Sequence, residues 1–580
     1  MPALAKQNSV RSLIPPVLLP DQREFLTWES PNAPVFIKDI YVDCANPSAG
    51  DDNPGTADRP FKTINGAAQI AAAGDRVVIH SGTYRERVAP ARGGDSPERM
   101  IHYAAALGAE VIVSGSNIIT PSWLLSDTYA QEGIDVWLFD IDSSWFDDGY
   151  NPFDIENVTS AQFASMDWTH PERNNPLFSL PRGLVFQDGV RLVQVNSVDD
   201  LGSTTAAYWV DRKSQQVHVR PINGINPNDA TFEVTARETV FAPYVENLGY
   251  IHVSGLIVEH AAGPWPFPQL GAISTARGHH WIIENNVVRQ VNGVGIDIGR
   301  QKLEDYDRVY GFHIVRGNWI SDCGICGING FGPGDGDTEN GLLVENNLIE
   351  RIGFHDAENL HECGGIKLHC CNRCLIRRNL VIDTLRGPGI WIDAHNAYTR
   401  CCENVILKSS GRGGLFFEIS FKPNLIDSNI IWSSTTCGIL EADGHGQTFA
   451  HNFIGDCREG IELRGKQTDR IAAEDCGAHE VFNNVIVNCD VPVLEKSIIP
   501  SRIESNLTHC NTASLSVENL ELTWSAAGCA QLKCVDVPER THDIYSRPIE
   551  PWSGQGPFGD VPAVRRTFEL ASIVQLGRIC

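Results

Sequence analysis

No long apolar run occurs anywhere in the 580 residues of the chain. A helix that crosses a membrane needs about 20 consecutive, mostly apolar residues, so a transmembrane helix is excluded. The N-terminal stretch contains only the short run LIPPVLLP, which prolines interrupt. It lacks the continuous apolar region and the small-residue cleavage site of a secretory signal. We therefore expect a cytoplasmic protein.

Basic residues are also scarce, because 46 Lys and Arg stand against 72 Asp and Glu, for a net charge of −26. A chain this acidic repels nucleic acid, anionic lipid and polyanionic sugars unless it carries a local basic cluster, and the sequence shows none. We expect no nucleic acid and no membrane among its partners. A neutral oligosaccharide substrate fits better, and assembly into a homo-oligomer is left open.

Helical patterning between strand-like segments is missing as well. No stretch of 10–15 residues shows the period that separates strands in a βαβ fold. What recurs instead is a phrase of the form apolar-x-x-Asn-apolar-apolar, as in LVENNLI and LIRRNLV. Its asparagines are Asn286, Asn318, Asn347, Asn379, Asn404, Asn429, Asn452 and Asn484, with spacings between 23 and 32 residues.

Most of these phrases are followed by a second one that opens on glycine, such as GIWID or GLFFE. Each unit therefore holds at least two short β-rich segments separated by turns. Units of this length match the coils of a right-handed parallel β-helix, with the asparagines stacked at one turn. Propeller blades are longer, at about 40 residues, and the leucine spacing of a leucine-rich repeat is absent.

The predicted fold class is all-β: a right-handed parallel β-helix with an inserted β-sandwich-like domain. Residues 1–118 are expected to form an N-terminal arm, a capping helix in FKTINGAAQIAAAG and the first coils. Alternating strands over residues 119–243 predict an inserted antiparallel β-sandwich. The main β-helix with the functional cleft is expected over residues 244–535, and a tail that packs on it over residues 536–580.

The 17 cysteines include two CxxC pairs, Cys323–Cys326 and Cys371–Cys374. Four thiolates could bind zinc, but these pairs lie 45 residues apart inside repeating strands. We favour small apolar side chains packed in the core of the repeat.

Two carboxylates become neighbours when the coils are aligned. Asp393 lies 14 residues after Asn379, and Glu418 lies 14 residues after Asn404. Alternation along a strand puts both carboxylates on the outer face, together with the aromatic Trp391, because the isoleucines between them take the core. Adjacent coils stack about 4.8 Å apart, so the two carboxylates should lie side by side.

This spacing selects a chemistry. Retaining glycosidases place their two carboxyl groups about 5–5.5 Å apart, whereas inverting ones need about 6.5–9.5 Å to admit a water molecule. Two anions this close also push one pKa upward, which leaves an acid beside an ionised partner. The plainer interpretation is a solvated acidic pair, and the aromatic side chains on the same face argue against it.

The preceding coil contributes more polar residues to this face. The run HECGGIKLH places Lys367 and His369 one coil before Asp393, with His361 and Glu362 in the turn that enters the strand. Histidines, a lysine and several carboxylates that converge on one face are typical of a cleft that carries chemistry.

Further candidates for substrate binding are Trp391, Asp443 and Trp145. Counting from the asparagine of the next coil stacks Asp443 beside Glu418, whereas counting from its glycine stacks Ala442 there. Trp145 lies in the expected insert, where its ring could stack on a sugar or be buried in the sandwich.

The phrases HECGGIKLH, GIWID and GLFFE resemble glycoside hydrolase family 120, and the opening YVD…PGT…PF and the insert share the resemblance. Members of that family are β-xylosidases built on a right-handed β-helix with an inserted β-sandwich. The resemblance implies that Asp393 is the nucleophile and Glu418 the acid/base. The positions that match contacts to the sugar are His361, Glu362, Lys367 and His369.

The implied activity is that of a retaining exo-glycosidase of xylan degradation. It would release xylose from the non-reducing end of short xylo-oligosaccharides, with no cofactor and no metal. The cytoplasmic expectation agrees with this, because a cytoplasmic enzyme meets imported oligomers rather than polymer.

Two other classes remain open. A polysaccharide lyase on the same fold would use a base such as Lys367 and calcium held by an acidic loop, for which GDGDTENG offers Asp335, Asp337 and Glu339. A carbohydrate-binding β-helix without catalytic activity is the other alternative.

Overall fold

The computed structural model describes residues 17–30, 34–146, 149–158, 180–264, 269–299, 311–334, 337–355, 362–465, 476–508, 513–524, 540, 542, 544, 557–558 and 566–570. Within these residues, none of the helices has the length and apolar character needed to cross a membrane.

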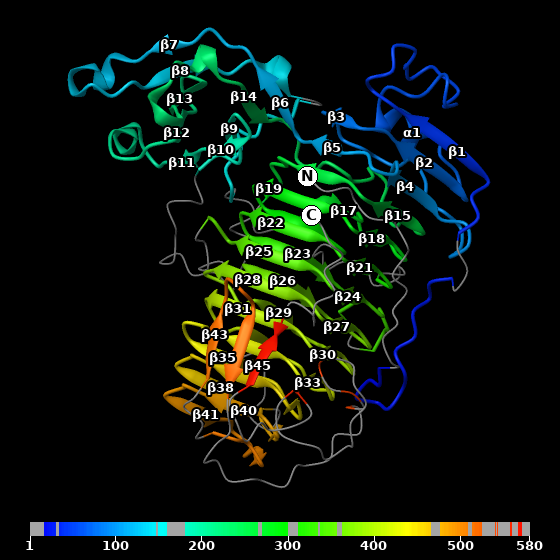
Figure 1. Ribbon diagram of the computed structural model, residues 1–580, viewed down its shortest axis with the longest axis vertical. Coiled ribbons are helices and arrows are strands. Elements are labelled where there is room, and N and C mark those ends of the chain that lie inside the picture. Colours follow the sequence, from blue (N-terminus) through cyan, green and yellow to red (C-terminus); the bar gives the residue numbers. More distant parts are fainter. Residues whose placement is uncertain are drawn as a thin grey trace.

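Three long parallel sheets run along the molecule, and from β15 Ile251–Ser254 onward the chain visits each of them in turn once per coil, up to β41 Val491–Lys496 (Figure 1). The first sheet contains β1 Lys38–Val42, β2 Asp75–Ile79, β4 Ile101–Ala105, β15 Ile251–Ser254, β18 Ile282–Glu284, β21 Ile314–Arg316, β24 Leu343–Glu345, β27 Leu375–Arg377, β30 Arg400–Cys402, β33 Leu425–Asp427, β36 Thr448–Ala450, β39 Glu480–Phe482 and β42 Arg502–Glu504.

The second sheet contains β3 Gly82–Tyr84, β5 Val111–Ser114, β16 Ile257–Glu259, β19 Val287–Val291, β22 Trp319–Cys323, β25 Leu348–Ile352, β28 Leu380–Leu385, β31 Val405–Ser410, β34 Ile430–Trp432, β37 Phe453–Gly455 and β40 Val485–Val487. The third sheet contains β17 Gly271–Ser274, β20 Val294–Asp297, β23 Cys326–Phe331, β26 Gly364–His369, β29 Ile390–Asp393, β32 Leu415–Glu418, β35 Cys437–Ala442, β38 Glu459–Arg464 and β41 Val491–Lys496.

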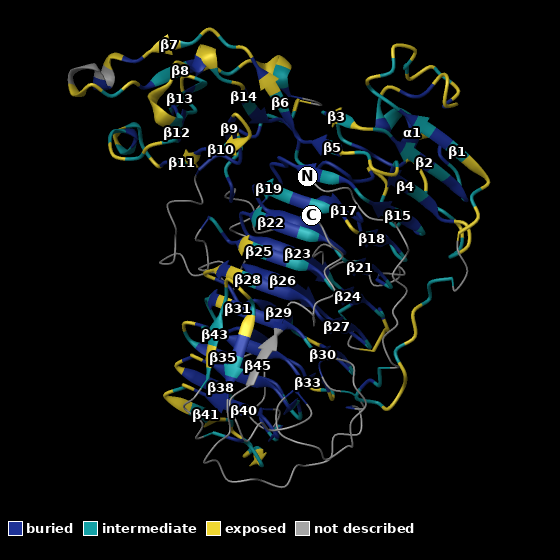
Figure 2. Ribbon diagram, in the orientation of Figure 1, coloured by how far each residue is buried: buried dark blue, intermediate teal, exposed yellow. Residues whose placement is uncertain are grey.

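One continuous apolar core fills the space between the sheets (Figure 2). Ile366, Ile390 and Leu415 stack in register on the inner face of the third sheet, and all three are fully buried. Alternation along each strand sends every second side chain outward. The right-handed parallel β-helix predicted from the repeat is confirmed.

The recurring asparagines form a buried ladder at one turn. Asn404 is representative: its Nδ2 donates to Ile376 O at 3.1 Å and to Asn429 Oδ1 at 3.0 Å, and its Oδ1 accepts from Asn379 Nδ2 at 3.0 Å. The ladder runs through Asn286, Asn318, Asn347, Asn379, Asn404, Asn429, Asn452, Asn484 and Asn506. Each member thus satisfies backbone groups that the turn would leave unpaired.

The N-terminal end of the core is covered by α1 Ile64–Ile70. Thr63 caps this helix, and its side chain accepts a hydrogen bond from Gly66 N at 2.9 Å. Ile64, Ala67 and Ala68 belong to the main core cluster, so the helix shields the first coil from water.

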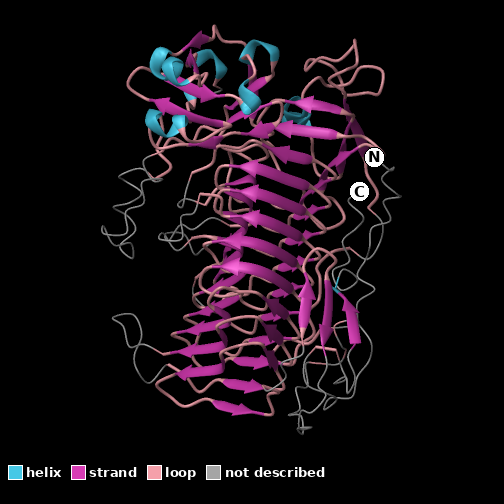
Figure 3. Cartoon of the chain, turned by 60° about the vertical axis from the view of Figure 1, so that its left-hand side comes forward, coloured by secondary structure: helices cyan, strands magenta, loops and turns pink. Residues whose placement is uncertain are grey.

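Two small sheets stand outside the three long ones, at the α1 end of the molecule (Figure 3). One contains β10 Val190–Arg191, β9 Val185–Gln187, β14 Phe232–Thr235 and β6 Ser116–Ile119; the other contains β11 Val193–Gln194, β12 Ala207–Asp211, β13 Gln216–Arg220, β8 Trp137–Asp140 and β7 Leu124–Leu125. They enclose a separate apolar core. All their strand pairs are antiparallel except β11 with β12, which is parallel and differs from the predicted pattern.

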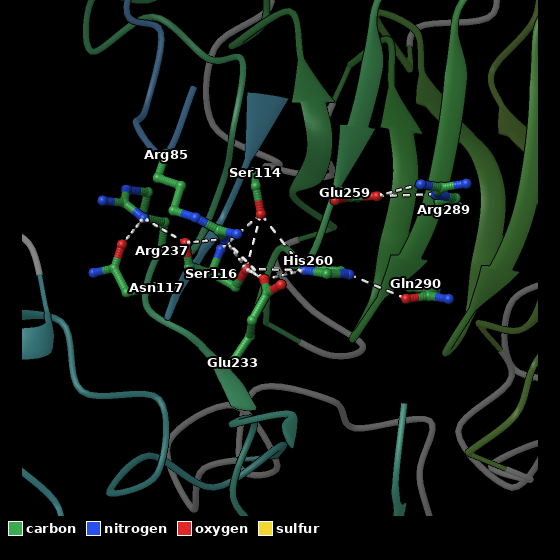
Figure 4. A network of polar contacts seen from close by, with 10 residues as sticks. All are labelled: Arg85, Ser114, Ser116, Asn117, Glu233, Arg237, Glu259, His260, Arg289 and Gln290. Carbon is green, nitrogen blue, oxygen red and sulfur yellow. Dashed lines mark hydrogen bonds and ion pairs between the residues drawn. The ribbon is translucent and has the colours of Figure 1, made fainter. Parts of the chain in front are cut away.

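A polar network joins this insert to the first coils (Figure 4). Glu233 on β14 accepts hydrogen bonds from Arg85 Nη1 at 2.8 Å and Ser116 Oγ at 2.6 Å. His260, directly after β16, places Nδ1 2.9 Å from Ser116 Oγ and stacks on Phe186. Burial opposes the charge of Glu233, but His260, Arg85 and Ser116 hold its pKa below the usual range.

Near the other end, β43 Ser514–Ser516, β44 Glu521–Trp524 and β45 Arg566–Glu569 form an antiparallel sheet. Leu522 and Trp524 pack on outward-facing residues of the second sheet, among them Ile430 and Phe453. Of the expected tail over residues 536–580, most lies outside the described residues.

Several described cysteines occupy the positions that the core interpretation favoured, whereas Cys402 and Cys437 pack in smaller clusters outside the main core. Cys323, Cys371, Cys374 and Cys401 belong to the main apolar cluster and are free thiols.

Candidate active site

Three neighbouring strands, β26, β29 and β32, present the predicted residues on the outer face of the third sheet. Lys367 pairs with Trp391, which pairs with Phe416, and His369 pairs with Asp393. Ile392 on β29 pairs with Phe417 on β32. The next residues along these two strands are Asp393 and Glu418, so these two lie side by side. Strands in a sheet lie about 4.8 Å apart, so the structure brings the two carboxylates together as the coil alignment predicted.

Asp393 is held between two basic side chains. His369 Nε2 lies 2.9 Å from Asp393 Oδ2, and Lys367 Nζ lies 3.3 Å from the same oxygen. Burial alone would raise the pKa of Asp393, but His369 and Lys367 outweigh it and hold this pKa well below its usual range. Asp393 is therefore ionised at neutral pH.

Glu418 has the opposite environment. Trp391 Nε1 donates to Glu418 Oε2 at 3.2 Å, and the rings of Trp391 and Phe416 lie 5.0 Å apart beside it. Burial and then the negative charge of Asp393 raise the pKa of Glu418 to about 8, against the weaker opposing effects of Arg412 and Lys367. Glu418 is thus largely protonated at neutral pH, next to an ionised partner.

Lys367 connects the pair to Glu362. Lys367 Nζ donates to Glu362 Oε2 at 2.7 Å and lies 3.6 Å from the centre of the Trp391 ring. Burial favours the neutral amine, but Glu362 and Asp393 raise the pKa of Lys367, so it remains a cation. His361, predicted beside Glu362, lies outside the described residues.

Asp443 does not stack beside Glu418. The structure pairs Glu418 with Ala442, so the count from the glycine of this coil is right and the count from its asparagine is wrong. Asp443 follows in the left-handed region at φ 63°, and its Oδ2 lies 3.9 Å from Arg464 Nη2. This coil has one residue fewer between its asparagine and its glycine than the two coils before it, which shifted the count.

Trp145 ends the short helix η2 Ser143–Trp145 and packs against the apolar core of the insert. Its ring lies 5.8 Å from Phe139, and its carbonyl accepts a hydrogen bond from Asn117 Nδ2 at 2.5 Å. Trp145 is therefore partly buried against the core of the insert, and its contact with a substrate stays a prediction.

The loop considered for calcium contains carboxylates that contact cationic side chains. Asp337 Oδ1 lies 2.5 Å from Lys422 Nζ, and Glu339 Oε2 lies 3.6 Å from Arg23 Nη2. Asp335 lies outside the described residues. Across the part of the chain that the structure describes, no group of three His, Cys, Asp or Glu residues is arranged to hold a metal ion.

Two residues near the pair were missed by the sequence analysis. Arg412 lies in the turn that enters β32, and its guanidinium carbon is 5.8 Å from the Phe416 ring centre. Its position in GRGG, just before GLFFE, was a usable signal. Gln269 Nε2 donates to Glu362 Oε2. It comes from a segment far earlier in the chain, and no repeat position marks it.

Comparison with known proteins supports the fold. A family model described as "Periplasmic copper-binding protein (NosD)" matches residues 336–538, about a third of the chain. A solved structure described as "The complex structure of XylC with xylose" shares 21% sequence identity at a TM-score of 0.69 and covers 92% of this chain and 100% of that one. At this identity the likeness shows a shared parallel β-helix fold and no more.

Two further solved structures are more distant. One described as "Glycoside hydrolase" has 11% identity and a TM-score of 0.46, covering 79% of this chain and 96% of that one. One described as "Crystal structure of pectate lyase Pel9A" has 11% identity and a TM-score of 0.37, covering 82% and 80%. No curated protein matches the sequence.

The expectation of a cytoplasmic location is wrong on these findings, because the matching family model is that of a periplasmic protein. Its basis, a missing apolar leader at the N-terminus, could not decide the compartment. The argument for short oligomers that rested on a cytoplasmic location falls with it.

Proposed function

We propose that this protein is a retaining exo-glycosidase that releases xylose from the non-reducing end of short xylo-oligosaccharides. The observation that carries the proposal is the pair of Asp393 and Glu418 on adjacent strands, one carboxyl held ionised and the other with a pKa of about 8. A nucleophile beside an acid is what double displacement at a sugar requires.

In the first step, Asp393 attacks the anomeric carbon. His369 and Lys367 both contact Oδ2, which leaves Oδ1 to form the bond to the sugar. Glu418 gives its proton to the departing glycosidic oxygen, and Trp391 holds Oε2 of that carboxyl, so the proton is carried by Oε1. The C–O bond to the leaving group breaks as the ester to Asp393 forms.

In the second step, Glu418 is ionised and accepts a proton from water, which attacks the same carbon and releases Asp393. Two displacements at one carbon retain its configuration. Lys367 and Glu362 form an ion pair at the side of Asp393 that faces away from Glu418, where sugar hydroxyls can exchange hydrogen bonds with them.

Xylose is favoured as the sugar on the resemblance of HECGGIKLH, GIWID and GLFFE to glycoside hydrolase family 120. The shared fold with a protein described in complex with xylose is consistent with this choice. A lyase fits the site less well, because its base must be neutral and the pKa of Lys367 is raised.

A panel of substrates tests the proposal. Nitrophenyl β-xyloside should be cleaved faster than the arabinoside, glucoside and galactoside, and polygalacturonate should yield no unsaturated uronate absorbance. Absorbance from polygalacturonate would identify a lyase, and sugar binding without any turnover would identify a binding protein; either result contradicts the proposal.

Variants of the pair assign the two roles. Glu418→Ala should lose most activity on xylobiose yet keep more on aryl xylosides, which need little protonation, and azide should rescue it as a glycosyl azide of retained configuration. Asp393→Ala should be inactive on both substrates. Equal losses in the two variants on both substrates, with no azide rescue, would contradict the assignment.

A further inference from the structure

Asn329 is a buried side chain whose polar atoms are unsatisfied. It lies on β23 between Ile328 and Gly330, and because Ile328 belongs to the main core cluster, Asn329 faces outward from the third sheet. The residue is 0% exposed, yet neither Oδ1 nor Nδ2 has a hydrogen-bond partner in the described structure. An outward-facing amide that is both covered and unpaired is unfavourable unless something binds it.

Gln269 is a second buried amide with an unpaired polar atom. It is 1% exposed, and Nε2 donates to Glu362 Oε2. Its Oε1 has no hydrogen-bond partner within the described residues. Within the described residues, Glu362 accepts two hydrogen bonds, one from Gln269 Nε2 and one from Lys367 Nζ, and both are accepted by Oε2. Both amides therefore border the Lys367–Glu362 ion pair and have unused hydrogen-bonding capacity.

The asparagines of the turn ladder show how the chain satisfies buried amides when they have a structural role. Asn404 in the turn ladder uses both its Oδ1 and its Nδ2, and the other ladder asparagines repeat the pattern. An unpaired amide is therefore not a general feature of this repeat. Single unpaired amide atoms also occur at Gln194, Asn247, Asn340 and Asn346, but within the described residues Asn329 is the one buried amide with both Oδ1 and Nδ2 unpaired.

Register places Asn329 relative to the chemistry. Asn329 pairs with Lys367, which pairs with Trp391, so Asn329 lies two strands from β29, on the side away from Glu418. Two strands span about 10 Å. If the anomeric carbon of a sugar sits at Asp393 and its leaving oxygen at Glu418, the far side of the ring points toward Asn329 and Gln269.

We infer that Asn329 and Gln269 bind the hydroxyl groups of the terminal sugar that lie farthest from the scissile bond. The inference rests on the proposed function. An amide offers a donor and an acceptor together, which suits a pair of neighbouring ring hydroxyls. Both amides are covered, so the terminal sugar must displace part of that cover to reach them, and a chain that continued beyond these hydroxyls would displace more of it. The site takes a neutral sugar whose distal hydroxyls are free.

Deoxy substrates test the contact directly. A site that hydrogen-bonds a hydroxyl rejects an analogue that lacks it, because its own polar groups are then left unpaired. Wild-type kcat/KM should fall by about 100-fold or more from nitrophenyl β-xyloside to its 3-deoxy or 4-deoxy analogue. Asn329→Leu should lose more than about tenfold on the parent, yet discriminate against that analogue by less than about threefold. Wild-type discrimination in the variant against both analogues would overturn the inference.

Thermal unfolding separates binding from a structural role. Asn329→Leu should melt at or above the wild-type temperature, because it removes an unpaired buried amide and keeps the side-chain size. Asn404→Leu is the matched control and should melt well below wild type, since it breaks the side-chain hydrogen bonds to Ile376, Asn379 and Asn429. A fall in Asn329→Leu equal to that of the control would show that Asn329 is structural and overturn the inference.

Calorimetric titration with free xylose keeps the inference distinct from the proposed function. Absence of hydrolysis by the wild type would remove the proposed function alone. Xylose binding should then still weaken by more than about tenfold in both Asn329→Leu and Gln269→Met. Unchanged binding in the two variants, or no binding of xylose to the wild type, would overturn the inference.

Discussion

At the scale of single residues, Asp393 and Glu418 differ in environment more than in chemistry. Both are carboxyls at the end of a strand on the same outer face. Lys367 and His369 lie on the strand before Asp393, whereas Glu418 faces aromatic rings and the charge of Asp393. Cations on one side and burial on the other drive the two pKa values apart, which assigns the acid and the nucleophile.

The pH dependence of kcat/KM should show this asymmetry. The alkaline limb should have an apparent pKa near 8, because activity is lost as Glu418 loses its proton. The acid limb should lie below the usual range of an aspartate, because the pKa of Asp393 is held down. Initial rates on nitrophenyl β-xyloside measure both limbs.

Glu418→Ala, assayed on an activated aryl xyloside, is the control for this profile. Its alkaline limb should disappear while the acid limb stays. An alkaline limb between pH 4 and 5 in the wild type would show that Glu418 behaves as an ordinary glutamate.

Glu362→Gln should lower kcat by more than about tenfold without unfolding the protein. The substitution removes the charge that pairs with Lys367 at 2.7 Å and weakens acceptance of hydrogen bonds from sugar hydroxyls, which strengthen in the transition state. Steady-state kinetics and circular dichroism measure the two effects. Glu462→Gln, which alters the exposed pair with Lys496, is the control and should leave kcat near wild type. Wild-type kinetics in Glu362→Gln would remove this residue from the site.

Residue placement could be predicted only where the repeat fixes it. The period of the strands gave the outward direction of Trp391 and Asp393, and the glycine count gave Ala442 beside Glu418. Gln269 could not be predicted, because it reaches Glu362 by tertiary packing across 93 positions of the chain. Asp443 was misplaced because one turn of its coil has a different length.

At the scale of elements, each catalytic strand ends in the same way. Cys370, Ala394 and Ile419 directly follow β26, β29 and β32, and all have positive φ, between 41° and 55°. A β-branched residue such as Ile419 is disfavoured there, and such strain is commonly found at functional sites. This turn ends the strand directly after Asp393 and Glu418.

The stacked asparagines link neighbouring coils through buried hydrogen bonds. Asn404→Leu should lower the free energy of unfolding by about 3 kcal/mol, because its buried side-chain hydrogen bonds break and partners in the neighbouring coils are left unpaired. Urea titration followed by circular dichroism measures the change.

Asn506, at the end of the ladder, is the comparison for Asn404. It accepts from Asn484 and donates to Val481 O in a partly exposed setting, so Asn506→Leu should cost about half as much. Equal costs at the two positions would show that stacking does not decide the stability of the coils.

At the scale of the whole molecule, the β-helix is closed at one end by α1 and carries two added units. The insert contacts the first coils through Glu233, Arg85, Ser116 and His260, and the sheet of β43–β45 covers part of the second sheet. The sequence repeat predicted the β-helix because every coil repeats the same apolar alternation and the same turn asparagine. No repeated sequence pattern indicates the cellular compartment, and the expectation of a cytoplasmic location was wrong.

Glu233→Gln should destabilise the protein by about 3 kcal/mol at neutral pH, because it leaves Arg85 without its counter-charge. The pKa of Glu233 is lowered in the folded state, so its contribution is present above the ordinary pKa of 4.5 and fades as the pH falls below it. The difference in melting temperature between wild type and variant should therefore shrink below about pH 4.5.

Glu156→Gln is the control within the insert, since its pair with Arg212 is more than a third exposed on both sides and should contribute less than about 1 kcal/mol. If Glu233→Gln and Glu156→Gln melt alike at neutral pH, the network of Glu233 does not hold the insert in place.

The central claim is that Asp393 and Glu418, one strand apart, act by double displacement. Proton NMR of the first sugar released by the wild type from a β-xyloside tests this most directly, before mutarotation mixes the anomers. The account predicts β-xylose as the first product, with retained configuration. First formation of α-xylose would show a single displacement and contradict it.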